Sequence, residues 1–375
     1  MIIGIPAEVK ESENRVGLTP AGLEVLKMEG HSICVQSGAG ISSGFADEMY
    51  SDLGAEICES AEDVWGKSEM IVKVKEPIES EWKHMRRDQI LFTYLHLAAS
   101  EELTKAILES GVVALAYETV EGEGGDLPLL TPMSEVAGRM SVQAGIRYLE
   151  TDKGGSGILV GGVPGVAPGK VVIIGGGVVG MNAGIIAAGL GAKVTILDSS
   201  LNRLRYLEQT LPKNVEHLFS TREAIRQAIC DADLVVGAVL LAGQKAPHVL
   251  HKEDLKRMRK GSVLVDVSID QGGCFETIRP TTHSQPVYEI DGIIHYGVTN
   301  IPGIVPRTST PALTNSTLTY ILAIAEKGWE AACRDDLSLR AGLNALDGRL
   351  THKAVAETFG LEHVDPKVIL EHLAQ

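Results

Sequence analysis

Short apolar runs alternate with amphipathic segments along the first 130 residues. The apolar runs are rich in β-branched residues and have strand length, whereas segments 21–29 and 101–109 repeat apolar residues at helical spacing. This alternation predicts a mostly parallel sheet covered by helices. The predicted strands of this half are Ile2–Ile5, Ser32–Val35, Met70–Val74, Ile90–Thr93 and Val112–Ala116.

A turn-rich stretch at 122–132 marks a predicted domain boundary. A helix near 134–148 follows it, with Ser134 as candidate N-cap, and then a loop rich in Gly and Pro at 153–169. A second alternating block begins there. Its predicted strands are Val171–Ile174, Val194–Leu197, Leu234–Val239, Ser262–Val267 and Ile293–Tyr296.

The pattern therefore predicts an α/β chain with two Rossmann-like doubly wound domains separated by a cleft. Residues 131–305 form the second domain, and residues 1–130 with 306–375 form the first. This division assumes that a long helix at 312–333 and the segment after it return to pack on the first domain. A tail that packs on the second domain is the alternative.

Composition agrees with two ordinary globular domains, because 375 residues exceed the roughly 250–300 that one core supports. The net charge of −15 disfavours nucleic-acid binding, which needs clustered Lys and Arg. Five cysteines without C-x-x-C spacing disfavour a disulfide framework or a zinc site and favour a reducing compartment. Neither a signal peptide nor an apolar run of membrane-spanning length is seen, so a cytoplasmic protein is expected.

The segment after Lys170 carries a dinucleotide-binding fingerprint. Gly175, Gly177 and Gly180 form G-x-G-x-x-G directly after a β-branched strand and before a helical run. These glycines permit a tight turn, backbone approach to a pyrophosphate and close packing of helix on strand. The helix N-terminus offers free N–H groups to the phosphates. A glycine-rich turn that binds nothing is the alternative interpretation.

Asp198 ends the next predicted strand, 18 residues after Gly180. An acid at this position accepts hydrogen bonds from the adenosine ribose and repels a 2′-phosphate, which favours NAD over NADP. Arg203 lies close in sequence and could instead accommodate a phosphate.

Two cations follow predicted strands of the first half. Arg15 lies just after the first strand, where ligands bind in open α/β sheets, and could hold a substrate carboxylate through two parallel hydrogen bonds. Lys75 ends the run that begins at Met70 and could steer a carboxylate or polarise a carbonyl. The alternatives are a solvated surface arginine and an edge-strand lysine that discourages aggregation.

Two further residues are candidates for proton transfer. His96 follows the strand at Ile90–Thr93, and a histidine pKa near neutrality suits this work. Asp270 closes an apolar strand that also contains Asp266, and a carboxylate there is costly unless it has a partner. A satisfied buried histidine and a structural hydrogen-bond network are the alternatives. Asp270 is the better catalytic candidate of the two acids because it lies at the loop end.

Seven motifs in order make the chain resemble the L-alanine dehydrogenases over nearly its whole length. They are Glu13-Asn-Arg-Val-Gly-Leu-Thr-Pro, Val72-Lys-Val-Lys-Glu-Pro, Leu91-Phe-Thr-Tyr-Leu-His-Leu-Ala, Thr131-Pro-Met-Ser-Glu-Val-Ala-Gly-Arg-Met-Ser, Gly175-Gly-Gly-Val-Val-Gly, Asp270-Gln-Gly-Gly-Cys-Phe-Glu-Thr and His295-Tyr-Gly-Val-Thr-Asn-Ile-Pro-Gly. The sequence departs from many relatives at Ser200, where they have Asn.

The resemblance implies a role for each candidate. Arg15 and Lys75 would hold the substrate carboxylate, and His96 and Asp270 would be the acid–base pair. Asp198 would bind the adenosine ribose. The remaining cofactor positions that the resemblance implies are Ser134, Val239, Met133 and Asn300, the last two near the nicotinamide. It also implies a homohexamer.

The resulting hypothesis is reversible oxidative deamination of L-alanine to pyruvate and ammonia with NAD as acceptor. The site is expected in the cleft between the domains. Two rival functions remain at this point: a transhydrogenase or saccharopine-forming dehydrogenase with a similar NAD-binding region, and an NAD-binding protein without chemistry. Which of His96 and Asp270 is the main base stays open, because coupled groups can share a titration.

Overall fold

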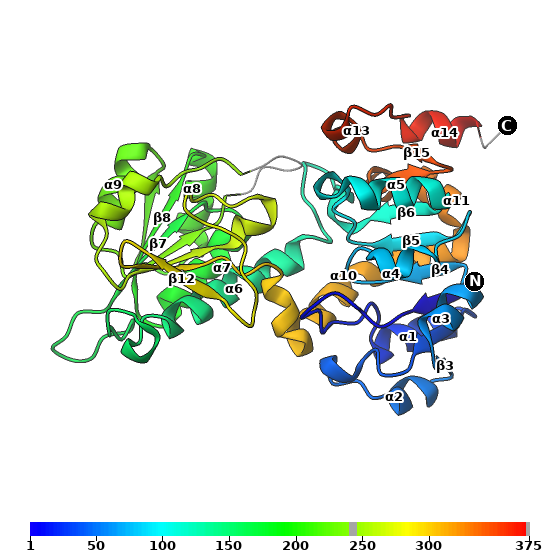
Figure 1. Cartoon of the computed structure of the whole chain (residues 1–375), viewed down its shortest axis with the longest axis horizontal. Coiled ribbons are helices and arrows are strands. Elements are labelled where there is room, and N and C mark those ends of the chain that lie inside the picture. The colour runs from blue at the N-terminus through cyan, green and yellow to red at the C-terminus, as the bar shows by residue number, and fades with distance from the viewer. Residues whose placement is uncertain (240–245, 373–375) are drawn as a thin grey trace. The chain divides into compact units, whose positions relative to one another are not determined.

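The computed structural model describes residues 1–239 and 246–372, which form two compact units (Figure 1). The first unit comprises Met1–Met133 with Gly303–Gln375, and the second comprises Ser134–Pro302. The first unit was expected to comprise residues 1–130 and 306–375, so its observed boundaries at Met133 and Gly303 each differ by three residues. Among the described residues, no helix is both long and apolar enough to cross a membrane.

The first unit is built on an eight-stranded sheet with the order β15-β14-β6-β5-β4-β1-β2-β3. Strands β1 to β6 pair in parallel, whereas β14 pairs antiparallel with β6 and β15 antiparallel with β14. The strands are β1 (Ile2–Ile5), β2 (Ser32–Gln36), β3 (Glu56–Cys58), β4 (Met70–Val72), β5 (Ile90–Thr93), β6 (Val113–Ala116), β14 (Leu343–Leu346) and β15 (Arg349–Leu350).

Local sequence explains where the helices of this unit begin and end. Thr19 caps α1 through its side chain, Ser100 caps α5, and Gly111 ends α5 with a φ of 69°. The helices are α1 (Pro20–Met28), α2 (Asp47–Ser51), α3 (Ala61–Lys67), α4 (Glu79–Trp82), α5 (Glu101–Ser110), α10 (Pro306–Lys327), α11 (Trp329–Asp335), α12 (Leu337–Ala341), α13 (Lys353–Phe359) and α14 (Pro366–His372).

The C-terminal segment returns to the first unit, as the sequence predicted, but it is not purely helical. Strands β14 and β15 extend the sheet, and α13 lies beside β15 (Figure 1). The single long helix expected at 312–333 is two helices, α10 and α11, because Gly328 between them adopts a φ of 78°.

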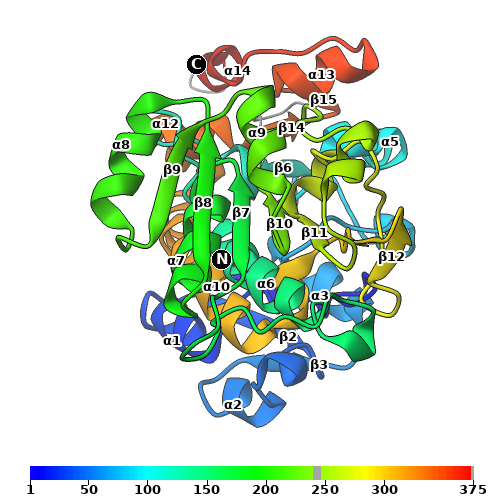
Figure 2. The same cartoon turned by 90° about the vertical axis from the view of Figure 1, so that its left-hand side faces the viewer.

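The second unit contains a seven-stranded sheet with the order β12-β13-β11-β10-β7-β8-β9. Only β12 is antiparallel to its neighbour among these described strands, and Figure 2 shows β9, β8, β7 and β10 side by side. The strands are β7 (Lys170–Ile174), β8 (Lys193–Asp198), β9 (Val215–Phe219), β10 (Leu234–Gly237), β11 (Val263–Asp266), β12 (Val287–Ile290) and β13 (Ile293–Tyr296). The helices are α6 (Thr131–Arg147), which starts in the first unit, α7 (Val178–Gly189), α8 (Leu201–Thr210) and α9 (Arg222–Ile229).

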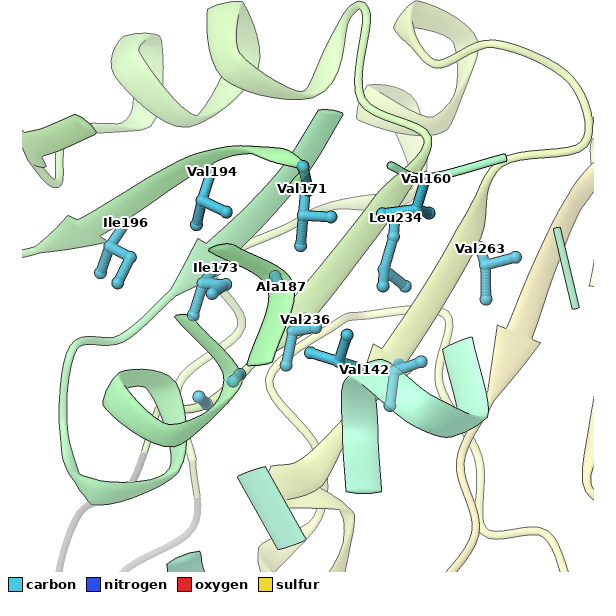
Figure 3. Close-up of a cluster of buried hydrophobic side chains, with 14 of the residues drawn as sticks. Val142, Val160, Val171, Ile173, Ala187, Val194, Ile196, Leu234, Val236 and Val263 are labelled. Carbon is cyan, nitrogen blue, oxygen red and sulfur yellow. The ribbon is translucent and has the colours of Figure 1, made fainter. Parts of the chain in front are cut away.

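Alternation along the central strands builds a core on each face of the second sheet. On one face, Val171, Ile173 and Val236 pack against Val142 of α6 and Ala187 of α7 (Figure 3). The intervening residues pack on the other face against α9. Burial on both faces explains why these strands read as continuous apolar runs.

Both sheets share one strand order. The six parallel strands of each sheet lie side by side as β3-β2-β1-β4-β5-β6 and β9-β8-β7-β10-β11-β13. When the strands of each set are numbered along the chain, both arrangements are 3-2-1-4-5-6, the order of a doubly wound fold. The predicted pair of Rossmann-like domains is therefore confirmed. In such sheets ligands bind beyond the carboxyl ends of the strands, where the order reverses. These points lie after β1 and β4 in the first unit and after β7 and β10 in the second.

Candidate functional site

The glycine turn after β7 has the geometry of a dinucleotide-binding turn. Gly175 has a φ of 101°, and a Cβ there would lie 2.3 Å from the Ala238 carbonyl oxygen. A Cβ at Gly180 would lie 1.8 Å from the carbonyl oxygen of Gly175, so only glycine lets α7 start this close to the strand. Gly177 is the N-cap of α7 and has open space around its Cβ position. The turn thus leaves room in front of the helix N-terminus, as a pyrophosphate requires.

Asp198 and Arg203 both hold this turn in place. The Asp198 carboxylate accepts from the Gly176 N–H at 2.7 Å and from the Ser200 N–H at 2.8 Å. Arg203 donates from Nε to the Gly176 carbonyl at 2.5 Å and from Nη2 to the Gly177 carbonyl at 3.2 Å. The guanidinium is therefore engaged with backbone oxygens. The carboxylate retains lone pairs with which it can accept ribose hydroxyls.

Ser200 has a structural role that accounts for its presence. Its side chain accepts from the Arg203 N–H and caps α8. Serine and asparagine are both good N-cap residues, so the departure from relatives at this position conserves the cap.

The other expected cofactor positions of the second unit lie at separate points of its fold. Val239 follows β10, and its carbonyl accepts from Ser268 Oγ at 2.7 Å. Asn300 is 8% exposed and adopts a left-handed φ of 57°. Ser134 is not an N-cap, because α6 begins at Thr131 and places Ser134 inside its first turn. Pro132 fits the first turn of this helix, because a backbone N–H at that position has no partner within the helix.

Arg15 is buried rather than solvated, which excludes the surface alternative. It is 2% exposed and forms a two-point pair with Glu13, from Nε to Oε1 at 2.7 Å and from Nη2 to Oε2 at 2.5 Å. Burial opposes the charge of Arg15, but Glu13 outweighs this effect and raises the pKa of the guanidinium. Its Nη1 lies 2.9 Å from the Sδ of Met133. A thioether is a weak acceptor, so this edge of the guanidinium suits a stronger one.

Lys75 does not lie at a sheet edge, because β4 pairs with both β1 and β5. The residue is 8% exposed, and its ammonium makes no hydrogen bond or ion pair with residues 1–239 or 246–372. Lys73, which shares its face, is fully buried and contacts Glu81 at 2.8 Å and Glu8 at 3.3 Å. The two lysines thus differ: Lys73 is neutralised inside the fold, and Lys75 remains available for a ligand.

His96 is held at the end of β5 in a left-handed conformation with a φ of 47°. Its backbone N–H donates to Glu118 at 2.6 Å, and its ring stacks on Tyr94 with the planes 5° apart. The side chain is 38% exposed, so it is not a satisfied core histidine. Tyr94 is itself anchored by a hydrogen bond from its hydroxyl to the Leu129 carbonyl. These contacts fix the ring while leaving part of it accessible.

Glu76 lies within the electrostatic influence of both Lys75 and His96. Its Oε1 accepts from Lys10 at 2.5 Å, and its buried Oε2 has no hydrogen-bond partner in the described part of the chain. Burial raises the pKa of this carboxyl, but the charges of Lys75, His96 and Lys10 outweigh burial and lower it. The first unit therefore gathers Arg15, Lys75 and His96 at the carboxyl ends of β1, β4 and β5.

Asp266 and Asp270 have different environments in the second unit. Asp266 is fully buried and accepts backbone N–H groups from Ser268, Cys274 and Phe275 at 2.8–3.0 Å. Burial raises its pKa to about 6, against the effect of these hydrogen bonds. Asp270 is exposed in the 3-10 turn Val267–Gln271 that follows β11. The structural-network alternative applies to Asp266.

Sequence reasoning missed the acidic partners of the cations. Glu8, Glu13 and Glu118 bind backbone N–H groups or buried cations, yet each stands outside the main helices and strands, where a charge is expected to be solvated from sequence alone. One signal in the sequence could have indicated them: several acids lie close along the chain to a cation that follows a strand. Partners from distant segments, such as Glu81 for Lys73, needed the fold.

Comparison with protein families decides the relationship. A model of the N-terminal domain of alanine dehydrogenase/PNT matches residues 4–137, and a model of the C-terminal domain matches residues 141–353. The chain belongs to the alanine dehydrogenase/PNT family. The C-terminal family region thus extends past the second unit into the first, from α10 to the first residue of α13.

Individual members of the family match along almost the whole chain. The alanine dehydrogenase of Halomonas elongata is 52% identical over 97% of this chain and 98% of its own length. That of Bacillus subtilis is 53% identical over 99% and 98%. A solved L-alanine dehydrogenase superposes with a TM-score of 0.93 at 52% identity, covering 96% of this chain and 99% of that one. A transhydrogenase from Sinorhizobium meliloti, with a TM-score of 0.81 at 21% identity, shows the fold alone.

Proposed function

We propose that this protein catalyses the reversible oxidative deamination of L-alanine with NAD. The overall change balances when L-alanine, water and NAD⁺ give pyruvate, ammonium, NADH and a proton. The observation that carries the proposal is that Arg15, Lys75 and His96 follow three adjacent strands of the first sheet, β1, β4 and β5. Full-length likeness to alanine dehydrogenases at 52–53% identity supports the same activity.

Arg15 and Lys75 bind the substrate carboxylate in this proposal. Glu13 fixes the Arg15 guanidinium through Nε and Nη2, so the Nη1 edge is presented in one orientation. A carboxylate replaces the weak Met133 sulfur contact with a charge-assisted hydrogen bond. The Lys75 ammonium supplies the second charge. Together they hold the Cα of a small amino acid in one position, which is the main requirement for reaction.

His96 and Asp270 manage the protons. NAD, when bound, accepts the hydrogen and electron pair that leave the Cα of alanine. Water then adds to the resulting imine carbon. We assign the activation of this water and the amine protons to Asp270, and a hydrogen bond to the developing hydroxyl to His96. The exposed carboxylate of Asp270 and the partly exposed ring of His96 suit exchange of protons with a substrate.

The second unit binds NAD in this account. The crowding at Gly175 and Gly180 and the open position at Gly177 fit the pyrophosphate, and Asp198 fits the adenosine ribose. Arg203 is tied to two backbone carbonyls, which favours NAD over a 2′-phosphorylated cofactor. We further assign Met133, Ser134, Val239 and Asn300 to the surroundings of the cofactor.

The first unit is correspondingly the substrate domain. We also propose that the protein is cytoplasmic and assembles as a homohexamer, both by analogy with the family that its motifs indicate. Size-exclusion chromatography with light scattering checks the assembly: a mass near six times 40.0 kDa is expected, and a monomer or dimer would contradict it.

A spectrophotometric screen tests the function. The purified protein is incubated with single amino acids and either NAD or NADP, and formation of the reduced cofactor is followed. L-alanine with NAD should give the highest kcat/KM. NAD binding without turnover of any amino acid would instead support a binding protein without chemistry, and preference for a lysine-pathway substrate would support the saccharopine-type rival.

A further inference from the structure

Cys34, Glu56 and Cys58 form a cluster at the β2–β3 edge of the first sheet. In the parallel register Cys34 pairs with Glu56 and Gln36 with Cys58, so the three side chains share one face. The two Sγ atoms and a carboxylate oxygen all lie within 4.8 Å of one another. Both thiols are free and nearly buried, with 3–4% exposed, whereas the Glu56 side chain is 56% exposed.

These distances are close to those of a metal centre. Zinc binds thiolate sulfur at about 2.3 Å and carboxylate oxygen at about 2.0–2.2 Å in a tetrahedron, which separates ligand atoms by about 3.5–3.8 Å. The Sγ of Cys34 and Oε2 of Glu56 are already 3.7 Å apart. The other two separations between ligand atoms are at most 4.8 Å, which exceeds the tetrahedral value by about 1 Å.

A positive charge already occupies this position. The ammonium of Lys67, at the end of α3, lies 2.6 Å from Oε1 of Glu56 and 3.9 Å from the Sγ of Cys58. The position of this ammonium indicates that the cluster attracts a cation. Lys67 is 45% exposed on a flexible side chain, so it can turn into solvent when a dication replaces it.

The cluster is open to solvent on one side. A surface pocket of about 430 Å³ is lined by Cys34, Glu56, Lys67 and Lys27. It provides an entry path and a place for a water as fourth ligand. The pocket also reaches Ile2 and Ser32, the first residues of β1 and β2, so it lies toward the amino end of the sheet. Arg15, Lys75 and His96 follow the carboxyl ends of its strands.

We propose that Cys34, Glu56 and Cys58 form a binding site for a thiophilic divalent cation, with Zn²⁺ as its representative. The cysteine spacing argued against a zinc site, because no C-x-x-C spacing exists and 22 residues separate the first two ligands. The cation ties the edge strand β3 to β2. It therefore stabilises the first unit and leaves the catalytic residues unchanged.

Titration of the chelator-treated, fully reduced protein with ZnCl₂ tests the proposal. Calorimetry should give one Zn²⁺ per chain and thermal unfolding a raised Tm, with no such effect from Mg²⁺. Titration with Cd²⁺ should produce the ultraviolet charge-transfer absorption of a thiolate–metal bond. Equal binding by the Cys34→Ser/Cys58→Ser double variant, or cadmium binding without that absorption, would overturn the assignment.

Two further variants sharpen the test. Cys230→Ser, at the exposed cysteine outside the cluster, should bind like the wild type. Lys67→Gln removes the competing cation and should tighten Zn²⁺ binding by roughly 10-fold, the effect of one nearby charge at intermediate dielectric. Misfolding cannot produce such a gain. Weaker binding by Lys67→Gln would contradict the proposal, and turnover of L-alanine should stay unchanged in both variants.

Discussion

At the residue scale, the candidate site is organised by carboxylates that hold cations in place. Glu13 fixes Arg15, Glu8 and Glu81 neutralise Lys73, and Glu118 binds the backbone at His96. Buried charges are tolerated only when they are paired in this way. The cations themselves were predictable, because each follows a strand at the ligand-binding edge. Their partners come from loops and helices, and their positions depend on the folded chain.

Replacement of Arg15 by Lys should weaken alanine binding. A lysine cannot form the two-point pair with Glu13 and presents its charge without fixed orientation. We expect kcat/KM for L-alanine to fall by about 10- to 100-fold, mainly through KM, with the Kd for NAD unchanged. Arg87→Lys, at an exposed ion pair with Asp347, is the control and should be neutral. An unchanged KM in Arg15→Lys would remove Arg15 from the substrate site.

Replacement of His96 by Ala should lower turnover and spare the cofactor. Loss of a proton-transfer group reduces kcat by about 10²–10⁴-fold. Because His96 belongs to the first unit and the proposed NAD-binding turn to the second, the Kd for NAD, measured by fluorescence, should change little. His363→Ala, at an exposed position, serves as the matched control. Near-normal turnover of the His96 variant would contradict its assignment.

At the scale of elements, the central strands were predictable and the edges were not. Strands β7, β8, β10 and β11 are mostly buried on both faces and have mainly apolar sequences. In contrast, β9 has the sequence Val-Glu-His-Leu-Phe and is partly exposed, so its polar residues interrupt the apolar run from which a strand is predicted. The return of β14 to pair with β6 depends on contacts more than 200 residues apart, which no local pattern contains.

Glycine substitutions should separate the fold of the turn from its cofactor contact. Gly180→Ala places a Cβ 1.8 Å from the Gly175 carbonyl oxygen, so α7 must shift, and Tm and NAD affinity should both fall. Gly177→Ala meets open space and should keep Tm while weakening NAD binding by at least about 10-fold, because the Cβ stands where the pyrophosphate is expected. Gly189→Ala, open and at the end of α7, is the control. A Gly177 variant with normal NAD affinity would contradict the proposed cradle.

The turn after β11 should make stability depend on pH through Asp266. Its pKa is raised in the folded state, so the folded protein binds the proton more tightly than the unfolded chain between pH 4 and 6. The contribution of Asp266 to the free energy of unfolding is therefore fully present below pH 4 and falls as pH rises through 6, by on the order of 2–3 kcal/mol.

Denaturant unfolding of wild type and Asp266→Asn across this range measures the effect. The advantage of wild type over the variant should be largest near pH 4 and shrink toward pH 7. Other carboxyls contribute equally to both proteins and cancel in the difference. A difference that stays constant with pH, or grows toward pH 7, would show that Asp266 does not titrate in this way.

At the scale of the whole molecule, one strand order serves two kinds of chemistry. Both sheets follow the order 3-2-1-4-5-6, and in each the candidate residues follow the carboxyl ends of parallel strands. The second has glycines that admit a pyrophosphate, whereas the first has buried cations that suit a carboxylate. Sequence periodicity predicted the shared architecture, and residue types at the strand ends predicted the division of roles.

Transfer of the Cα hydrogen is the central claim, and isotope labelling measures it most directly. L-alanine carrying deuterium at Cα is incubated with the protein and NAD⁺, and the products are analysed by mass spectrometry. The account predicts pyruvate and ammonium in equal amounts to a reduced cofactor that is one mass unit heavier than the unlabelled product. Reduced cofactor without deuterium, or no pyruvate from alanine at all, would contradict it.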